Sequence, residues 1–113
     1  MTCLFCQIAT GAIPSEIVYS SPDVTAFRDA NPQAPSHILV IPNRHVESLA
    51  EVGGTDPGLL AHLFEVINDV ARDEGIAEKG FRVVANTGPA AGQSVAHLHF
   101  HVLGGRTLSW PPG

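Results

Sequence analysis

The segment 97–103 constrains the fold more than any other part of the chain, because it alternates histidine with apolar residues. Successive side chains of a β-strand point to opposite faces. In an extended segment one face therefore carries His97, His99 and His101, and the other carries Leu98, Phe100 and Val102. The alternation predicts a strand over 96–103 that presents imidazoles on one side and packs on a core with the other.

A long helix is predicted over 57–74. Its apolar residues recur at helical spacing. Asp56 is suited to the N-cap, Pro57 to the first turn and Gly75 to the position just beyond the helix end. The helix is expected to bury one face against a sheet.

Short apolar and β-branched runs between turn residues indicate four further strands, at 17–19, 24–28, 37–41 and 81–86. Together with 96–103 they predict an α+β fold: a mostly antiparallel five-stranded sheet with the long helix and a short helix near 3–10. The whole chain, 1–113, is expected to form a single domain. A homodimer would allow so small a domain to bury more surface.

Composition and charge exclude several classes of function. The net charge is −5, and the six lysines and arginines form no basic stripe, which argues against a nucleic acid polymer as ligand. No apolar run approaches the roughly 20 residues of a membrane span. The first residues lack the features of a secretory signal, so the cytosol is the expected compartment.

The histidine face suggests chemistry at phosphorus. A nucleophilic histidine needs a free ring nitrogen aimed at its target and a fixed tautomer. His99, the middle of the three, is best placed for this role, and the turn formed by Gly92, Gln93 and Ser94 can present N–H groups to a phosphate. A catalytic metal held by the three histidines is the alternative.

Cys3 and Cys6 form a Cys-x-x-Cys pair near the amino terminus. A disulfide is unfavourable in the cytosol, and no βαβ pattern nearby supports a redox site. Metal binding is the more natural interpretation, and two reduced cysteines packed as small apolar side chains are the alternative.

The alternating histidines His97, His99 and His101, here called the triad, resemble the signature of the histidine-triad (HIT) nucleotide hydrolases and transferases. Further segments, 27–37, 92–95 and 104–113, are similar to the nucleotide-binding branch of that family, the purine nucleoside phosphoramidases. The last of them ends in Trp-Pro-Pro-Gly, and the resemblance covers essentially the whole chain. It implies a dimeric HIT-like fold.

The resemblance also implies catalytic roles. His99 would attack the α-phosphate and form a nucleotidyl-histidine intermediate, which water then hydrolyses. His101 would contact the phosphate, and the main-chain carbonyl of His97 would set the tautomer of His99. Ser94, with the N–H groups around Gly92 and Gln93, would hold phosphate oxygens and assist the leaving group.

Other residues would bind the nucleotide. Asn86 would reach the phosphate, and Asp29, beside Ala30, would accept the ribose hydroxyls. Each polar residue has a plainer alternative, since Asp29 suits the cap of a turn and Asn86 the turn that ends a strand. His37 resembles a family histidine that supports the triad, and its alternative is a purely structural residue.

Two features extend the comparison beyond the triad. Cys3 and Cys6 resemble bacterial HIT proteins in which two cysteines and two histidines bind zinc; the corresponding histidines are His45 and His97. Such a set fits a closed structural site.

Trp110 lies on a tail that is predicted to be neither helix nor sheet, so its ring needs a docking place, either against a partner subunit or as a lid. The resemblance places it near the partner's leaving-group pocket.

The sequence thus favours a cytosolic, homodimeric hydrolase of the P–N bond in purine nucleoside phosphoramidates, which releases a nucleoside monophosphate. Within the family, the alternatives are hydrolysis of dinucleoside polyphosphates or adenylyl sulfate, and nucleotidyl transfer. The Trp-Pro-Pro-Gly terminus weighs against the polyphosphate branch. A nucleotide-binding regulatory module without turnover is the alternative of a different class.

Overall fold

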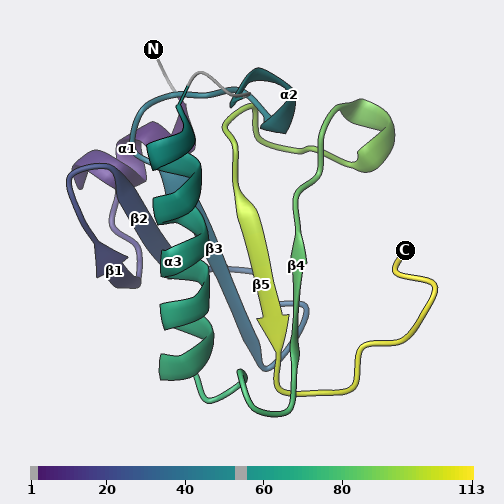
Figure 1. Cartoon of the computed structure of the whole chain (residues 1–113). Coiled ribbons are helices and arrows are strands. Elements are labelled where there is room, and N and C mark those ends of the chain that lie inside the picture. Colours follow the sequence, from purple (N-terminus) through teal and green to yellow (C-terminus); the bar gives the residue numbers. More distant parts are fainter. Residues whose placement is uncertain (1–2, 53–55) are drawn as a thin grey trace.

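The chain folds around one antiparallel sheet with the strand order β1-β2-β3-β5-β4, in a computed structural model that describes residues 3–52 and 56–113 (Figure 1). The strands are β1 (Ile17–Ser20), β2 (Val24–Arg28), β3 (Ser36–Pro42), β4 (Phe81–Val84) and β5 (Phe100–Gly104). The helices are α1 (Leu4–Thr10), α2 (Leu49–Val52), α3 (Pro57–Asp73) and the 3-10 turn η1 (Pro89–Ala91). This confirms the predicted α+β fold.

The long helix α3 covers one face of the sheet (Figure 1). The side chain of Asp56 accepts a hydrogen bond from the Leu59 N–H and so caps the helix, as its sequence position predicts. The buried face of α3 includes Leu63, Val66 and Ile67 and packs on β2, β3 and β5. The helix ends at Asp73, one residue before the predicted end.

The short helix α1 packs on the opposite face of the sheet. Its buried residues Phe5 and Ile8 form a second core with Phe27, Leu39 and Ile41 from β2 and β3. The two layers divide the alternating segment, because Leu98, Phe100 and Val102 join the α3 core while the histidines lie toward α1.

Two predicted strands are shorter in the structure, and the remaining strand ends agree with prediction to within one residue. The strand predicted over 96–103 begins only at Phe100, because the Leu98 N–H donates to the Val46 carbonyl (2.6 Å) instead of a neighbouring strand. The strand predicted over 81–86 ends at Val84. The helical turns α2 and η1 were not predicted. No helix among the described residues is long and apolar enough to cross a membrane.

Replacing Gly104 by alanine is expected to destabilise the fold by about 1–3 kcal/mol. Gly104 is buried between Ser36 and Phe81 in the sheet, and a Cβ there would lie 2.8 Å from both Cβ and Cδ1 of Ile76. Urea denaturation measures the change. Gly58→Ala is the matched control, since a Cβ at this helical position meets nothing within 4 Å. Equal stability of the two variants would contradict the prediction.

Candidate functional site

The three histidines of the alternating segment lie on the face of the sheet that α1 covers. His97 is fully buried, His99 is 5% exposed and His101 is partly buried in β5. The Phe5 ring meets the rings of His97 and His99 edge to face, at centroid distances of 5.9 and 5.1 Å. The alternation of faces therefore holds, although the strand begins later than predicted.

The tautomer of His99 is set by the main chain. Its Nδ1 lies 2.7 Å from the carbonyl oxygen of His97, and a carbonyl can only accept a hydrogen bond. Nδ1 therefore carries the proton, and Nε2 keeps its lone pair. A neutral imidazole fixed in this way has the form that a nitrogen nucleophile requires.

A second chain of contacts fixes His101. The Gln33 N–H donates to Nδ1 of His37 (3.0 Å), so the neutral ring of His37 carries its proton on Nε2. That Nε2 lies 2.9 Å from Nδ1 of His101, which therefore accepts the hydrogen bond. The remaining proton of His101 is on Nε2. The site thus combines a lone pair on His99 with an N–H donor on His101.

Burial keeps both supporting imidazoles neutral. It lowers the pKa of His101 to about 4, with added repulsion from His99 and His37. Burial also lowers the pKa of His37, against the attraction of Asp29. The proton chain from Gln33 to His101 is therefore intact at neutral pH.

The free energy of unfolding is expected to fall as the pH is lowered from about 6.5 to about 4. Folded His101 stays neutral in this range, whereas the unfolded chain takes up the proton, so acid favours the unfolded state. Urea denaturation at several pH values measures the slope. His101→Gln should have a shallower slope than the parent protein, and parallel slopes would contradict the assignment.

The loop between β4 and β5 uses many of its own polar groups. The amide nitrogen of Asn86 donates to the Ala91 carbonyl (2.7 Å), and the N–H groups of Gly92 and Gln93 donate to the carbonyls of Pro89 and Gly88. The Gln93 side chain accepts from the Gly88 N–H and donates to the Glu47 and Val95 carbonyls. Ser94 is exposed and makes no hydrogen bond within the described chain.

Asp29 lies at the edge of the same site. One of its oxygens accepts from the Asn31 N–H (2.8 Å), which is the turn-capping contact, and the other lies 3.4 Å from Nε2 of His37. Ala30, the next residue, is exposed. Asp29 therefore combines a capping role with a position beside the histidines.

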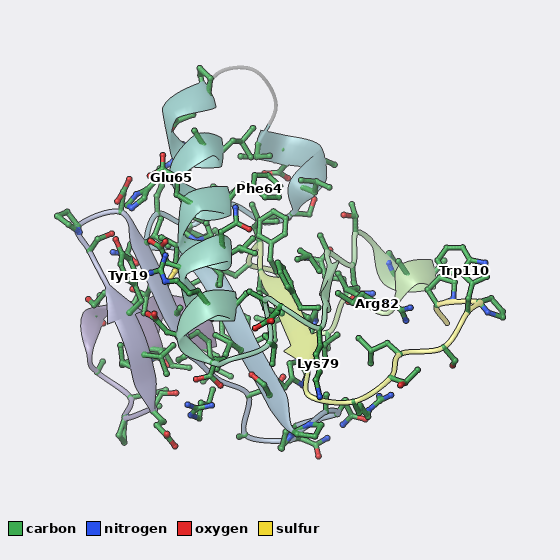
Figure 2. All side chains as sticks on the ribbon, turned by 60° about the horizontal axis from the view of Figure 1, so that its bottom comes forward. Tyr19, Phe64, Glu65, Lys79, Arg82 and Trp110 are labelled. Atoms are coloured by element: carbon green, nitrogen blue, oxygen red, sulfur yellow. The ribbon has the colours of Figure 1, made fainter. Side chains whose placement is uncertain are left out.

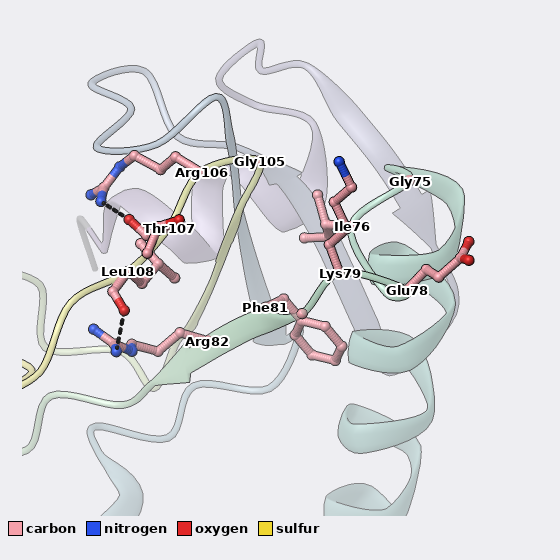
Figure 3. A pocket seen from close by; sticks show the side chains of 11 residues that line it. Gly75, Ile76, Glu78, Lys79, Phe81, Arg82, Gly105, Arg106, Thr107 and Leu108 are labelled. Atoms are coloured by element: carbon pink, nitrogen blue, oxygen red, sulfur yellow. Dashed lines mark hydrogen bonds between the residues drawn. The ribbon is translucent and has the colours of Figure 1, made fainter.

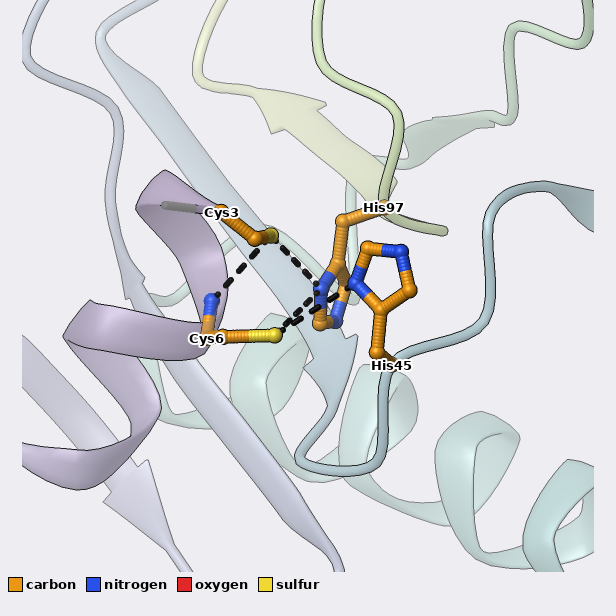
Figure 4. Close-up of side chains that lie close together, drawn as sticks. All are labelled: Cys3, Cys6, His45 and His97. Carbon is orange, nitrogen blue, oxygen red and sulfur yellow. Dashed lines mark hydrogen bonds between the residues drawn. The ribbon is translucent and has the colours of Figure 1, made fainter. Parts of the chain in front are cut away.

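A separate cluster joins α1 to the histidine segment (Figure 4). Sγ of Cys3 lies 3.3 Å from Nδ1 of His97, and Sγ of Cys6 lies 3.4 Å from Nδ1 of His45 and 3.5 Å from Nδ1 of His97. A tetrahedral zinc site with ordinary bond lengths requires sulfur-to-nitrogen distances of about 3.5 Å. The donor set therefore fits zinc in both chemistry and spacing.

The tautomer of His97 also fits a metal ligand. Its Nε2 lies 2.8 Å from the Pro42 carbonyl and so carries the proton, which leaves the Nδ1 lone pair facing the two thiols. Burial lowers the pKa of His97, which favours the neutral ring that a metal needs. Burial raises the pKa of the Cys6 thiol, so a bound cation would have to displace its proton.

Asp29, His37 and His101 also bring ligand atoms close together. A metal on Nε2 of His37 would move the ring proton to Nδ1, where the Gln33 N–H already points. Two donors would then face each other, so this cluster favours hydrogen bonding. The unprotonated Nδ1 of His97 faces the cysteines, and its Nε2 donates to the Pro42 carbonyl. Neither ring nitrogen of His97 is therefore available for a metal shared with His99 and His101, which disfavours the alternative of a three-histidine metal centre.

The tail after β5 carries Trp110, which is 81% exposed in the single chain (Figure 2). Nη2 of Arg82 donates to the carbonyls of Leu108 (3.3 Å) and Ser109 (2.9 Å) and so holds the tail beside β4. The structure thus leaves the indole ring available to another surface.

Three contributors to the site were not predicted from the sequence. They are the Phe5 ring, the Gln33 N–H and the Pro42 carbonyl. Two of the three are main-chain groups, a carbonyl that every residue possesses and an N–H that every residue except proline possesses, so side-chain chemistry gives no signal for them. The position of Phe5 between the two cysteines was the one available hint.

The antiparallel sheet, the opposed helix layers and the buried histidine cluster define a small α+β protein with an imidazole centre. The chain belongs to the HIT domain family, whose model matches residues 10–108. It is 50% identical over 110 residues to an uncharacterised HIT-like protein of Synechococcus elongatus, covering 97% of this chain and 96% of that protein.

Further relatives include a 14 kDa zinc-binding protein of Zea mays, which is 47% identical over 112 residues. The alignment covers 97% of this chain and 87% of that protein. Among solved structures, a HIT family hydrolase from Legionella pneumophila has a TM-score of 0.97 and 45% identity, with 99% of this chain and 100% of that chain covered. A histidine triad protein from Clostridium difficile has a TM-score of 0.92 and 46% identity, with 96% and 95% covered.

Proposed function

We propose that this protein hydrolyses the P–N bond of purine nucleoside phosphoramidates and releases a nucleoside monophosphate. The observation that carries the proposal is the pair of fixed tautomers, with a lone pair on Nε2 of His99 and a proton on Nε2 of His101. The solved structure from Legionella pneumophila is that of a HIT family hydrolase, which supports hydrolysis as the reaction.

In the proposed reaction Nε2 of His99 attacks the α-phosphorus, the P–N bond of the substrate breaks, and the leaving amine takes up a proton from solvent water. His101 donates a hydrogen bond to a phosphoryl oxygen, where charge accumulates in the transition state. Water then attacks the phosphorus of the nucleotidyl-histidine and loses a proton to the solvent. The bond between phosphorus and Nε2 of His99 breaks, its electron pair returns to Nε2, and the monophosphate leaves. The His97 carbonyl accepts a hydrogen bond from Nδ1–H of His99 throughout and stabilises its positive charge in the intermediate.

Other residues would hold the substrate. Ser94 is the proposed donor to the phosphate and the leaving group, because the N–H groups of Gly92 and Gln93 are used within their loop. Asn86 would reach the phosphate by exchanging its contact with the Ala91 carbonyl. Asp29, with Ala30, would accept the ribose hydroxyls through the carboxylate.

Zinc is the proposed metal of the cluster formed by Cys3, Cys6, His45 and His97. The zinc-binding relative from Zea mays supports the assignment. The metal would join α1, the loop after β3 and the segment before β5, and it would take no part in the reaction. The cytosol is the proposed compartment, since thiols stay reduced there and remain available as ligands.

The experiment that tests the function compares three substrates side by side. The protein is incubated with an adenosine phosphoramidate, a diadenosine polyphosphate and adenylyl sulfate, and release of adenosine monophosphate is measured. Fastest release from the phosphoramidate supports the proposal. Preference for either other substrate would assign the alternative activities of the family, and tight nucleotide binding without release would assign a regulatory module.

Truncation after Arg106 is expected to change the selectivity among amine leaving groups more than the attack at phosphorus. The exposed Trp110 has an apolar ring and a polar N–H, the combination favoured where an interface meets a wet pocket. We propose that it shapes the leaving-group pocket of a partner in a two-fold dimer. Sedimentation measures the dimer, and kcat/KM across several phosphoramidates measures selectivity; a monomer, or unchanged selectivity, would contradict this prediction.

A further inference from the structure

Half of the basic residues of the chain line one pocket outside the histidine cluster. The pocket has a volume of about 900 Å³ and lies between the loop after α3 and the tail after β5 (Figure 3). Lys79, Arg82 and Arg106 line it, which is three of the six lysines and arginines in the chain. Glu78 is the one acidic residue among the described lining residues. The pocket is therefore net positive in a chain whose net charge is −5.

These three cations differ from the other three in the chain, because the other three form ion pairs with carboxylates. Nitrogens of Arg28, Arg44 and Arg72 lie 2.7, 3.2 and 3.1 Å from carboxylate oxygens. In the ranges 3–52 and 56–113, the three pocket cations make no such pair. The residues outside those ranges contain no aspartate or glutamate. The cations without a carboxylate partner are thus the ones that gather at the pocket.

Main-chain contacts hold the two arginines in place without neutralising them. Arg106 donates from Nη1 to the Thr107 carbonyl and from Nη2 to the Gln33 carbonyl, both at 3.0 Å. Arg82 donates only from Nη2, to the tail carbonyls described above. The Nε–H of each guanidinium makes no hydrogen bond in the described chain. Their charges are therefore positioned and remain available to an anion.

The rest of the lining suits a small molecule. Ile76, Phe81 and Leu108 contribute apolar surface between the cations. The volume lies in the range of ordinary small-molecule sites. Planar guanidiniums and an ammonium together match a compact group with several anionic oxygens better than they match a single carboxylate.

We propose that this pocket binds a phosphate group, either free or on a small monoester, at a site distinct from the histidine cluster. The test is an NMR titration at constant ionic strength with two probes, inorganic phosphate and phenyl phosphate. Saturable shifts of the Gly105 and Thr107 amide resonances are expected. Tighter binding of phenyl phosphate would identify an ester as the ligand type, because its ring would contact the apolar lining, and equal binding would identify free phosphate. Shifts confined to residues around His99, or no saturation, would overturn the proposal.

Charge-matched variants separate local from long-range effects. Lys79→Gln and Arg106→Gln should each lower the affinity about three- to tenfold, the range of a partly exposed charged hydrogen bond. Arg44→Gln removes the same charge from a cation paired with Asp56 and should leave the affinity unchanged. The Lys79 side chain makes no hydrogen bond within the described residues, so its variant should fold normally. Equal weakening by Arg44→Gln and Lys79→Gln would show that only net charge matters and would overturn the proposal.

Discussion

Replacing His99 by alanine or asparagine is expected to lower turnover of an adenosine phosphoramidate at least about a thousandfold while nucleotide binding persists. The substitution removes the attacking Nε2. It leaves His101, Ser94 and Asp29 in place, so the contacts proposed for phosphate and ribose remain. Steady-state kinetics measures the loss, and calorimetric titration with adenosine monophosphate measures the binding.

The matched control is His62→Ala. His62 lies on α3, where its ring contacts Tyr19 and Asp23, and the residue has no part in the proposed site. Turnover of this variant should match that of the parent protein. A quenched reaction of the parent should also carry an acid-labile nucleotidyl group on His99. A stable adduct on Ser94, or more than a few per cent residual activity in His99→Ala, would contradict the role of His99.

The sequence predicts the fold through two strong periodicities. The alternation at 97–103 and the helical spacing at 57–74 each identify a buried face, and a sheet covered by the long helix satisfies both. The start of β5 could not be predicted, because it depends on a hydrogen bond between Leu98 and Val46, which are far apart in sequence. Local propensity contains no information about such a partner.

The candidate site, like the fold, could be predicted only in part from the sequence. Its reactive side chains are predicted by residue type and spacing, whereas the atoms that fix their tautomers belong to the main chain. The carbonyls of His97 and Pro42 and the N–H of Gln33 decide which ring nitrogens carry protons. Only the folded backbone brings these groups to the rings. The sequence also could not show that the N–H groups of Gly92 and Gln93 donate to the carbonyls of Pro89 and Gly88, because the folded turn at η1 brings these groups together.

Zinc removal is expected to lower the stability of the protein by about 3 kcal/mol, which corresponds to about 13 °C in Tm for a chain of this size. The proposed site joins Cys3 and Cys6 on one side to His45 and His97 on the other, so the metal would link segments 39 to 94 residues apart in sequence. Elemental analysis of protein prepared without chelator should find about one zinc per chain.

Cys6→Ser separates the metal from the cysteine packing. This variant should lose zinc and show the lowered Tm, and a chelator should lower the Tm of the parent protein without lowering that of the variant further. Loss of zinc should change the activation free energy of the chemical step less than it changes the free energy of unfolding. The reason is that the His97 carbonyl holds the proposed nucleophile, whereas the His97 ring would hold the metal. Zinc-free parent protein with an unchanged Tm would instead identify Cys3 and Cys6 as partly buried thiols that pack as small apolar side chains and bind no metal.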